Sequence, residues 1–245
     1  WRMDVFNSHG KIYEASASQM FGVPVESITK GSTLRQKGKI AELALGYGGS
    51  KGALKAMGAI DMGLSEEELP ELVSAWRKSN SNIVRLWWDV ESAAIKAVKE
   101  RTVVSMQYGL KFYFKSGVLF IRLPSGRSLA YVRPRIEIDE RFNKDKLTYE
   151  GIEGMKWGRI DTYGGKLTEN IIQAIARDCL AESMLRLEKY GYRIVFHVHD
   201  EVILDVPNDK GSLKEVEEIM GLDIPWAPGL PLRAEAFESD YYKKD

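Results

Sequence analysis

Residues 192–207, YRIVFHVHDEVILDVP, contain two β-rich runs that meet at His199 and Asp200. Val, Ile and Phe favour strands, and a short polar pair between two such runs is typical of a tight turn. We therefore expect an antiparallel hairpin over residues 193–206, with Asp200 and Glu201 presented at its tip.

A carboxylate on a rigid turn suits a hard cation such as Mg²⁺, which proteins hold with one or two carboxylates together with substrate phosphates. Asp200 is the candidate metal ligand, and Glu201 is a neighbouring carboxylate. A polar turn without a chemical role explains the same aspartate. His197 and His199 also allow a metal-dependent hydrolase that uses the HVHD run as zinc ligands, although His9 is the one other histidine in the chain.

The pattern around the hairpin predicts an α+β fold, with helices first, then strands, then a helix and the hairpin. TENIIQAIARDCLAESMLRLEKYG predicts a long helix over 168–190, closed by Gly191. Residues 102–160 are expected to be β-rich, with runs VVSMQYGLKFYF, GVLFIRL and SLAYVRPRIEI separated by Ser-Gly turns. Further helices are predicted at residues 11–22, 33–48, 65–79, 82–101 and 213–221.

The chain has 245 residues, 44% of them hydrophobic, which supports a sizeable buried core. It contains one cysteine, Cys179, and no apolar run of the length needed to span a membrane. We therefore expect a soluble, cytoplasmic protein with no membrane partner. Its first residues show neither an initiator Met nor a signal peptide, so we expect the chain to begin as a piece of a longer protein.

Charge is segregated along the chain although the formal net charge is zero. Lys30–Lys55 holds six basic residues and one acid, and Arg101–Arg135 holds seven basic residues and no acid. Asp200–Asp245 holds 12 acids and five bases. Solvated surface explains any one of these runs. Together they fit phosphate contacts in the basic segments and cation binding at the acidic end.

The segment STLRQKGKIAELALGYGG contains the second group of candidate site residues. Arg35, Lys39, Leu43 and Tyr47 recur every four residues, which places them on one side of the predicted helix 33–48. Along this side, two cations come first, then an aliphatic side chain, and then an aromatic ring beside Gly48. A nucleoside triphosphate has the same order of phosphates, sugar and base. An ordinary amphipathic helix explains the charges, but not why Tyr-Gly follows in register.

RQKGKIAELALGYG resembles the R-x3-K-x6-7-YG signature of the nucleotide-binding fingers helix in family A DNA polymerases, the DNA polymerase I type. HVHDEV resembles the palm hairpin of that family, and TENIIQAIARD is similar to the palm helix of its bacteriophage members. The resemblance runs through nearly the whole chain and implies an incomplete right-hand polymerase fold. Its expected parts are fingers at 1–101, a β-rich hairpin segment at 102–160 and a portion of the palm at 161–245.

The resemblance implies template-directed DNA synthesis, in which a dNTP is transferred to a primer 3′-hydroxyl. Lys39 would contact the triphosphate and donate a proton to the leaving pyrophosphate, with Arg35 and His9 as further phosphate ligands. Tyr47 would lie at the base of the nascent pair, and Leu43 would face the sugar.

The same resemblance implies roles for the hairpin and the helix before it. Asp200 would be one of two aspartates that hold two Mg²⁺ ions, with Glu201 as a secondary carboxylate. His199 would lie near the primer terminus and Gln173 near the minor groove of the primer-template. His197 has no role in this scheme, so we interpret it as structural.

The sequence departs from the family at three places. Leu43 replaces the usual Phe or Tyr, which leaves sugar discrimination open, and Glu169 replaces an Asn of many relatives. The D-x-S-x-x-E motif with the other metal aspartate, expected shortly before Trp1, is not in the sequence. The expected partners are therefore primer-template DNA, a dNTP and an upstream polymerase segment, in a bacterial or phage-infected cell. A non-catalytic nucleic-acid-binding module remains an alternative, as does the hydrolase.

Overall fold

The computed structural model describes residues 1–140 and 142–243. Its helices and antiparallel strands confirm the predicted α+β class. The chain forms two compact units, which we call the large unit and the hairpin unit. The large unit contains residues 1–106, 111–121 and 130–170, and the hairpin unit contains 107–110, 122–129 and 171–245. The assignment of fingers and palm stays a prediction.

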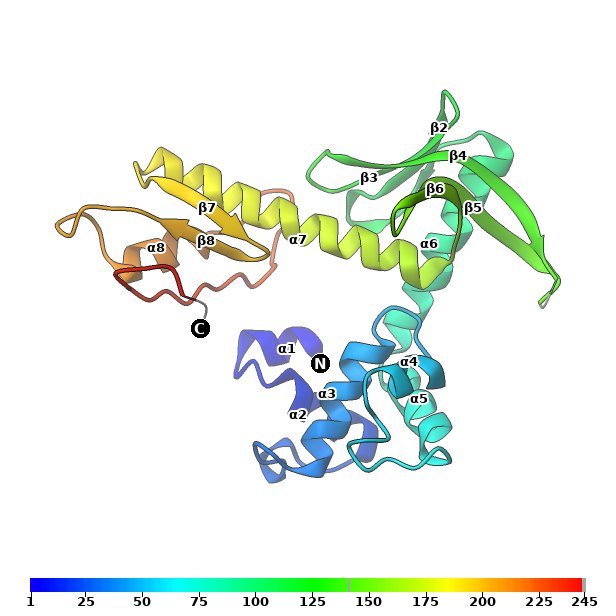
Figure 1. The fold of residues 1–245 in the computed structure, drawn as a ribbon, viewed down its shortest axis with the longest axis horizontal. Helices are drawn as coiled ribbons and strands as arrows, with labels where there is room; N and C mark the ends of the chain where they lie inside the picture. The colour runs from blue at the N-terminus through cyan, green and yellow to red at the C-terminus, as the bar shows by residue number, and fades with distance from the viewer. Residues whose placement is uncertain (141, 244–245) are drawn as a thin grey trace. The chain divides into compact units, whose positions relative to one another are not determined.

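The large unit begins with a layer of helices around an apolar core (Figure 1). Trp76 and Leu45 lie at the centre of this core, fully buried, and the Trp76 ring stacks on Trp87 with centroids 5.9 Å apart. The helices are α1 (Arg2–Asn7), α2 (Ile12–Phe21), α3 (Thr33–Leu45), α4 (Lys51–Ala56), α5 (Glu68–Ser79) and α6 (Ser81–Glu100), with a 3₁₀ turn η1 at Val25–Ser27.

Helix α3 packs closely on α2 because glycine occupies the crossing point. A Cβ at Gly38 would overlap the backbone oxygen of Tyr13 and touch Ala17. The Ser32 side chain caps α3 by accepting a hydrogen bond from the backbone N–H of Arg35 at 3.3 Å. These two features fix where α3 begins and how closely it approaches its neighbour.

In the described residues, six antiparallel strands follow in sequential order, and the register between β4 and β5 shifts at a bulge between Val132 and Arg135. Phe112, Leu119 and Ile121 are fully buried, and α6 packs against the sheet at β1, β2 and β5. The strands are β1 (Val104–Ser105), β2 (Lys111–Lys115), β3 (Val118–Arg122), β4 (Ser128–Asp139), β5 (Lys144–Glu153) and β6 (Lys156–Thr162), with a 3₁₀ turn η2 at Gln107–Gly109.

Helix α7 (Gly164–Lys189) begins in the large unit and continues through the hairpin unit. It starts four residues before the predicted 168–190 helix. Strands β7 (Ile194–Val198) and β8 (Glu201–Leu204) form the predicted antiparallel hairpin, which lies beside the C-terminal half of α7 (Figure 1).

The apolar sides of these elements meet α8 (Leu213–Met220) in a small core around Leu187, Tyr192 and Ile219. No helix within residues 1–140 and 142–243 combines the length and the apolar character that crossing a membrane requires.

Candidate functional site

The solvent-facing side of α3 holds the candidate phosphate-binding cation. Arg35, Lys39 and Leu43 all lie within α3, so the predicted four-residue spacing places them along one side of a real helix. Lys39 is exposed, and Leu43 is 49% exposed. Lys39 forms no ion pair with any residue that the structure describes, which leaves its ammonium group available to an anion.

Arg35 has a partner on the neighbouring helix. Its Nε donates to Oε1 of Glu14 on α2 at 2.7 Å, and its guanidinium lies 5.5 Å from the centre of the Tyr13 ring. Burial alone would raise the pKa of Glu14, but the hydrogen bond from Arg35, a backbone hydrogen bond and the charges of Arg35 and Lys11 together lower that pKa overall. The phosphate contact of Arg35 stays a prediction, and a phosphate there would share the guanidinium with Glu14.

The predicted helix 33–48 is too long, because α3 ends at Leu45 and Gly46 is its C-cap. Tyr47 consequently lies in the turn after the helix, and the four-residue spacing does not place it on the α3 face. Gly48 adopts φ +85°, a left-handed conformation that favours glycine. A Cβ there would lie 3.2 Å from the Tyr163 ring, so the absence of a side chain leaves room for Tyr163, and the expected approach of a base to Gly48 stays a prediction.

The turn after α3 rests on the start of α7. A Cβ at Gly165 would overlap the backbone oxygen of Tyr47, and one at Gly164 would overlap the backbone oxygen of Trp87. Burial, with a contribution from the charge of Glu169, raises the pKa of the Tyr47 hydroxyl. Tyr47 is therefore a neutral, partly buried aromatic residue held between α3 and α7.

His9 lies in the loop between α1 and α2 and is exposed. Its Nδ1 accepts a hydrogen bond from the backbone N–H of Lys11 at 3.0 Å, so Nδ1 carries no proton in this arrangement. The other ring nitrogen, Nε2, is the one left for a ligand. The phosphate contact of His9 stays a prediction.

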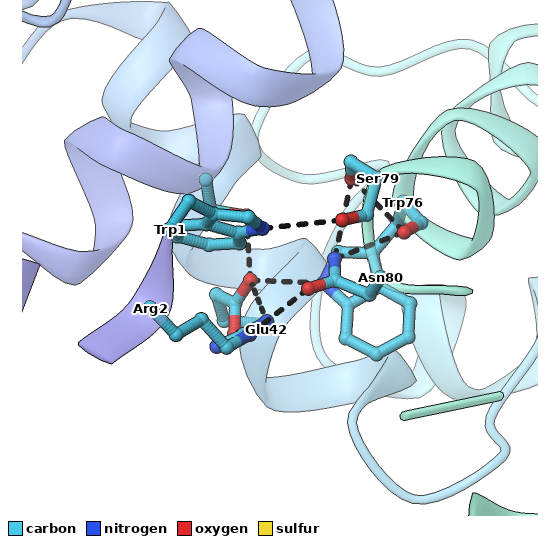
Figure 2. Close-up of polar contacts among 7 residues, drawn as sticks. Trp1, Arg2, Glu42, Trp76, Ser79 and Asn80 are labelled. Atoms are coloured by element: carbon cyan, nitrogen blue, oxygen red, sulfur yellow. Dashed lines mark hydrogen bonds and ion pairs between the residues drawn. The ribbon is translucent and has the colours of Figure 1, made fainter. Parts of the chain in front are cut away.

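Glu42 links α3 to the neighbouring helices, a feature that the sequence analysis missed (Figure 2). Its Oε1 accepts from Arg2 at 2.8 Å, from Ser16 at 2.5 Å and from the indole N–H of Trp76 at 2.9 Å. Arg2 also donates to Asn80 at 2.9 Å. Through this one carboxylate, α3 is tied to α1, α2 and α5.

The hairpin of the second unit presents its acidic residues at the tip. Val198 pairs with Glu201, which leaves His199 and Asp200 as a two-residue turn. His199 adopts φ +52°, an uncommon conformation for a residue with a side chain. His199 and Asp200 are exposed, and Glu201 is partly exposed, so the predicted presentation of the carboxylates is confirmed.

Helix α7 supplies a basic neighbour to the hairpin. Nη2 of Arg177 lies 3.2 Å from Nε2 of His197, and Arg177 is one helical turn after the exposed Gln173. The two residues in contact are 20 positions apart, so the sequence alone gave no signal for the pair. His197 thus has a specific partner in addition to its place in the strand.

A second arginine fastens the loop between β3 and β4, residues 123–127, to α7. Nε of Arg127 donates to Oδ1 of Asp178 at 2.6 Å, and its Nη2 donates to the backbone oxygen of Ala174 at 2.9 Å. Ser125 Oγ donates to the other carboxylate oxygen of Asp178 at 2.5 Å. Both carboxylate oxygens of Asp178 thus have partners in Arg127 and Ser125.

The donor set at the hairpin fits part of a Mg²⁺ site. Asp200 offers exposed oxygen ligands of the type that Mg²⁺ prefers, and Glu201 follows it directly. Within residues 1–140 and 142–243, no three His, Cys, Asp or Glu side chains come together in a way that could hold a metal. The hairpin residues therefore fit one carboxylate ligand rather than a whole metal site.

The predicted residues fall into two groups that belong to different units. His9, Arg35, Lys39, Leu43 and Tyr47 lie in the large unit, as does Gly48. Gln173, His199, Asp200 and Glu201 lie in the hairpin unit. Each unit thus carries one set of functional groups, cationic in the first and acidic at the tip of the second.

Comparison with known proteins relates this chain to a DNA polymerase. It is 67% identical over 246 aligned residues to a protein of Bacillus phage SP02 named "DNA polymerase". The match covers 100% of this chain and 38% of the relative, so the chain spans less than half the length of that protein. No protein-family model matches the chain.

A solved structure of a polymerase domain is similar to this chain in fold. It is the POL domain of Pol1 from M. smegmatis in complex with DNA primer-template and dNTP, with a TM-score of 0.57 and 20% identity. The likeness covers 94% of this chain and 34% of that chain. The expected resemblance to a DNA polymerase and the expected polymerase fold are therefore confirmed.

Proposed function

We propose that this chain is the nucleotide-binding and hairpin part of a template-directed DNA polymerase, which transfers a nucleotide from a dNTP to a primer 3′-hydroxyl. The observation that supports this most is 67% identity along the whole chain to a phage DNA polymerase. Lys39 on α3 is exposed and has no ion-pair partner among residues 1–140 and 142–243, which adds a chemical reason, because a polyphosphate needs cations at its binding site.

In this proposal, α3 binds the triphosphate. Lys39 Nζ contacts the phosphates, neutralises charge that develops on them and donates a proton to the leaving pyrophosphate. Arg35 and His9 add donors at the phosphate end, and Arg35 shares its guanidinium with Glu14. Tyr47 offers an aromatic surface to the base, and Gly48 lets the chain turn directly after it.

In this proposal, the hairpin unit contacts the primer and a divalent metal. Asp200 would hold divalent metal, with Mg²⁺ as the expected ion, which when bound activates the 3′-hydroxyl and stabilises charge on the phosphates. Glu201 adds negative charge beside Asp200. His199, on the same turn, is placed to contact the primer terminus, and Gln173 on α7 to contact the minor groove. The second metal carboxylate would come from an upstream polymerase segment.

The two alternatives make different predictions. A zinc-dependent hydrolase would use His197 and His199 as ligands and would purify with stoichiometric zinc. In the structure Nε2 of His197 faces Arg177 at 3.2 Å, and a cation at a ligand nitrogen disfavours a second cation. A non-catalytic binding module would bind primer-template without any partner that restores synthesis.

The first test measures dNTP binding to the 245-residue chain by calorimetry with Lys39→Ala and its matched control Lys37→Ala. Lys39 is exposed, whereas Lys37 is held by Glu68 at 2.9 Å. Loss of a charged phosphate contact is expected to weaken dNTP binding about 10- to 100-fold in Lys39→Ala. Lys37→Ala is expected to stay within about twofold of the unmodified chain.

Equal effects of the two substitutions on dNTP affinity would remove the basis for assigning the triphosphate to this face of α3. Binding that persists in both variants would place the nucleotide elsewhere. Because the two lysines are two residues apart on one helix, general effects on net charge are the same in both.

A further inference from the structure

One side of the β2–β3 hairpin carries two aromatic rings between two lysines. The rings of Tyr113 and Phe120 stack with centroids 5.3 Å apart and planes 21° apart. Lys111 and Lys115 lie two residues on either side of Tyr113, so strand alternation puts all three side chains on the same side of β2. We call these four residues the β2–β3 platform.

The platform faces away from the core of the large unit. Phe112, Leu119 and Ile121 alternate with the platform residues and are fully buried on the other side of the two strands. Tyr113 and Phe120 are half-buried, and both lysines are exposed. Residues on the opposite side of the strands already fill the core, so the rings of Tyr113 and Phe120 are not needed there.

The charge around the platform is positive. Residues 101–135 contain seven basic residues and no acid. Neither Lys111 nor Lys115 makes an ion pair with another residue in the part of the chain that the structure describes. Lys111 and Lys115 are therefore available to an anionic chain, whereas Arg127 and Arg133 of the same segment are paired with acids.

We propose that the β2–β3 platform binds a single-stranded segment of nucleic acid, which in the proposed reaction is the template strand outside the duplex. Aromatic rings on a sheet give bases a stacking surface, and flanking cations meet the phosphates. Bases inside a duplex are already stacked on one another, so they have no free face for the rings of Tyr113 and Phe120 to contact. The combination therefore fits a single strand better than a double helix. The identity of the strand rests on the proposed function, while binding itself does not.

The test measures anisotropy of a fluorescent oligo(dT) with the 245-residue chain and with the double variant Tyr113→Leu/Phe120→Leu. Leucine keeps apolar volume on the strands and removes the flat ring. Affinity for oligo(dT) is expected to fall about 5- to 100-fold per stacked base lost. An abasic oligonucleotide of the same length is expected to bind the double variant and the unmodified chain equally.

The lysines are tested by salt dependence. Lys111→Ala/Lys115→Ala is expected to lower the slope of log affinity against log salt by about 1.4, since each phosphate contact on a single strand contributes about 0.7. The matched control is Trp88→Ala/Lys144→Ala. This control removes another exposed aromatic residue and the lysine whose Nζ lies 4.9 Å from the centre of its ring. Unlike the platform lysines, Lys144 has an acidic neighbour, with its Nζ 3.9 Å from Oε1 of Glu91. This control is expected to bind oligo(dT) as the unmodified chain does.

The proposal is overturned if the folded Leu variant, verified by circular dichroism, binds oligo(dT) with unchanged affinity. It is also overturned if the variant loses affinity for the abasic strand or for duplex DNA to the same degree. The result stays separable from the polymerase proposal through Lys39→Ala. That substitution is expected to weaken dNTP binding and to leave oligo(dT) binding unchanged, so either proposal can fail alone.

Discussion

At the scale of single residues, Glu42 is the group on which the placement of α3 depends most. Its carboxylate accepts from Arg2, Ser16 and the fully buried Trp76. Glu42→Ala leaves a buried indole N–H and a partly buried arginine without their acceptor, so we expect a loss of about 3 kcal/mol in the free energy of unfolding. Urea titration measures this. The exposed Glu71 on α5 provides the control, because Glu71→Ala is expected to change stability by less than about 0.5 kcal/mol.

Leu43 gives a second prediction at this scale, which depends on the proposed function. Because Leu43 is 49% exposed, Leu43→Tyr adds a ring without disturbing the core. We expect the ratio of dideoxy to deoxy incorporation in primer extension to shift about tenfold, through new contacts at the sugar. Leu43→Met, of similar volume, is expected to leave the ratio unchanged. An unchanged ratio in Leu43→Tyr would mean that Leu43 does not face the sugar.

The sequence predicts candidate site residues, but not the residues that hold them in place. Lys39 and Asp200 were identified from local spacing, and both are exposed as expected. Glu42 with Arg2, and His197 with Arg177, are separated by 40 and 20 positions along the chain. Such pairs are formed by tertiary packing, which local patterns do not encode.

At the scale of elements, the ion pair between α2 and α3 predicts a pH effect. The pKa of Glu14 is lower in the folded chain than its ordinary value of 4.5, because the hydrogen bond and charge of Arg35, with a backbone hydrogen bond and Lys11, outweigh the effect of burial. The pair therefore stabilises the fold above about pH 4.5, and this contribution is lost as pH falls through the lowered pKa. We expect Glu14→Gln to be less stable than the unmodified chain at pH 7, with the difference shrinking toward pH 3. A difference independent of pH, measured by urea unfolding, would contradict this.

The elements that were predicted best have clear signals in the sequence. Gly191 marks the end of α7, and β-favouring residues flank the polar turn of the hairpin, whereas α1 and α4 have six residues each and too few positions to show a period. Strands β5 and β6 were not recognised individually, because Lys, Asp, Glu and Arg occupy many of their positions. The end of α3 was placed too late because Gly46, rather than Gly48, is its C-cap.

At the scale of the whole molecule, we expect the small number of carboxylate ligands at the hairpin to limit metal binding, and with it catalysis, by residues 1–245 alone. Two adjacent divalent ions need more anionic ligands than Asp200 and a triphosphate provide, and the described residues bring together no three His, Cys, Asp or Glu side chains that could hold a metal. Asp205 lies five residues beyond Asp200, and along an extended strand that is roughly 17 Å. We therefore expect the 245-residue chain to bind dNTP and nucleic acid but not to extend a primer.

Addition in trans of the part of the phage SP02 relative that lies outside the match, 62% of its length by difference from the 38% covered, is expected to restore primer extension. Asp200→Asn is expected to abolish the restored activity, since the amide keeps the shape of the turn and removes the charge that a cation needs. Its dNTP affinity is expected to match the unmodified chain, because Lys39 lies in the other unit. Unaided primer extension by the 245-residue chain that disappears in Asp200→Asn would show that the chain holds a second metal carboxylate, and that the limit argued from its ligands is wrong.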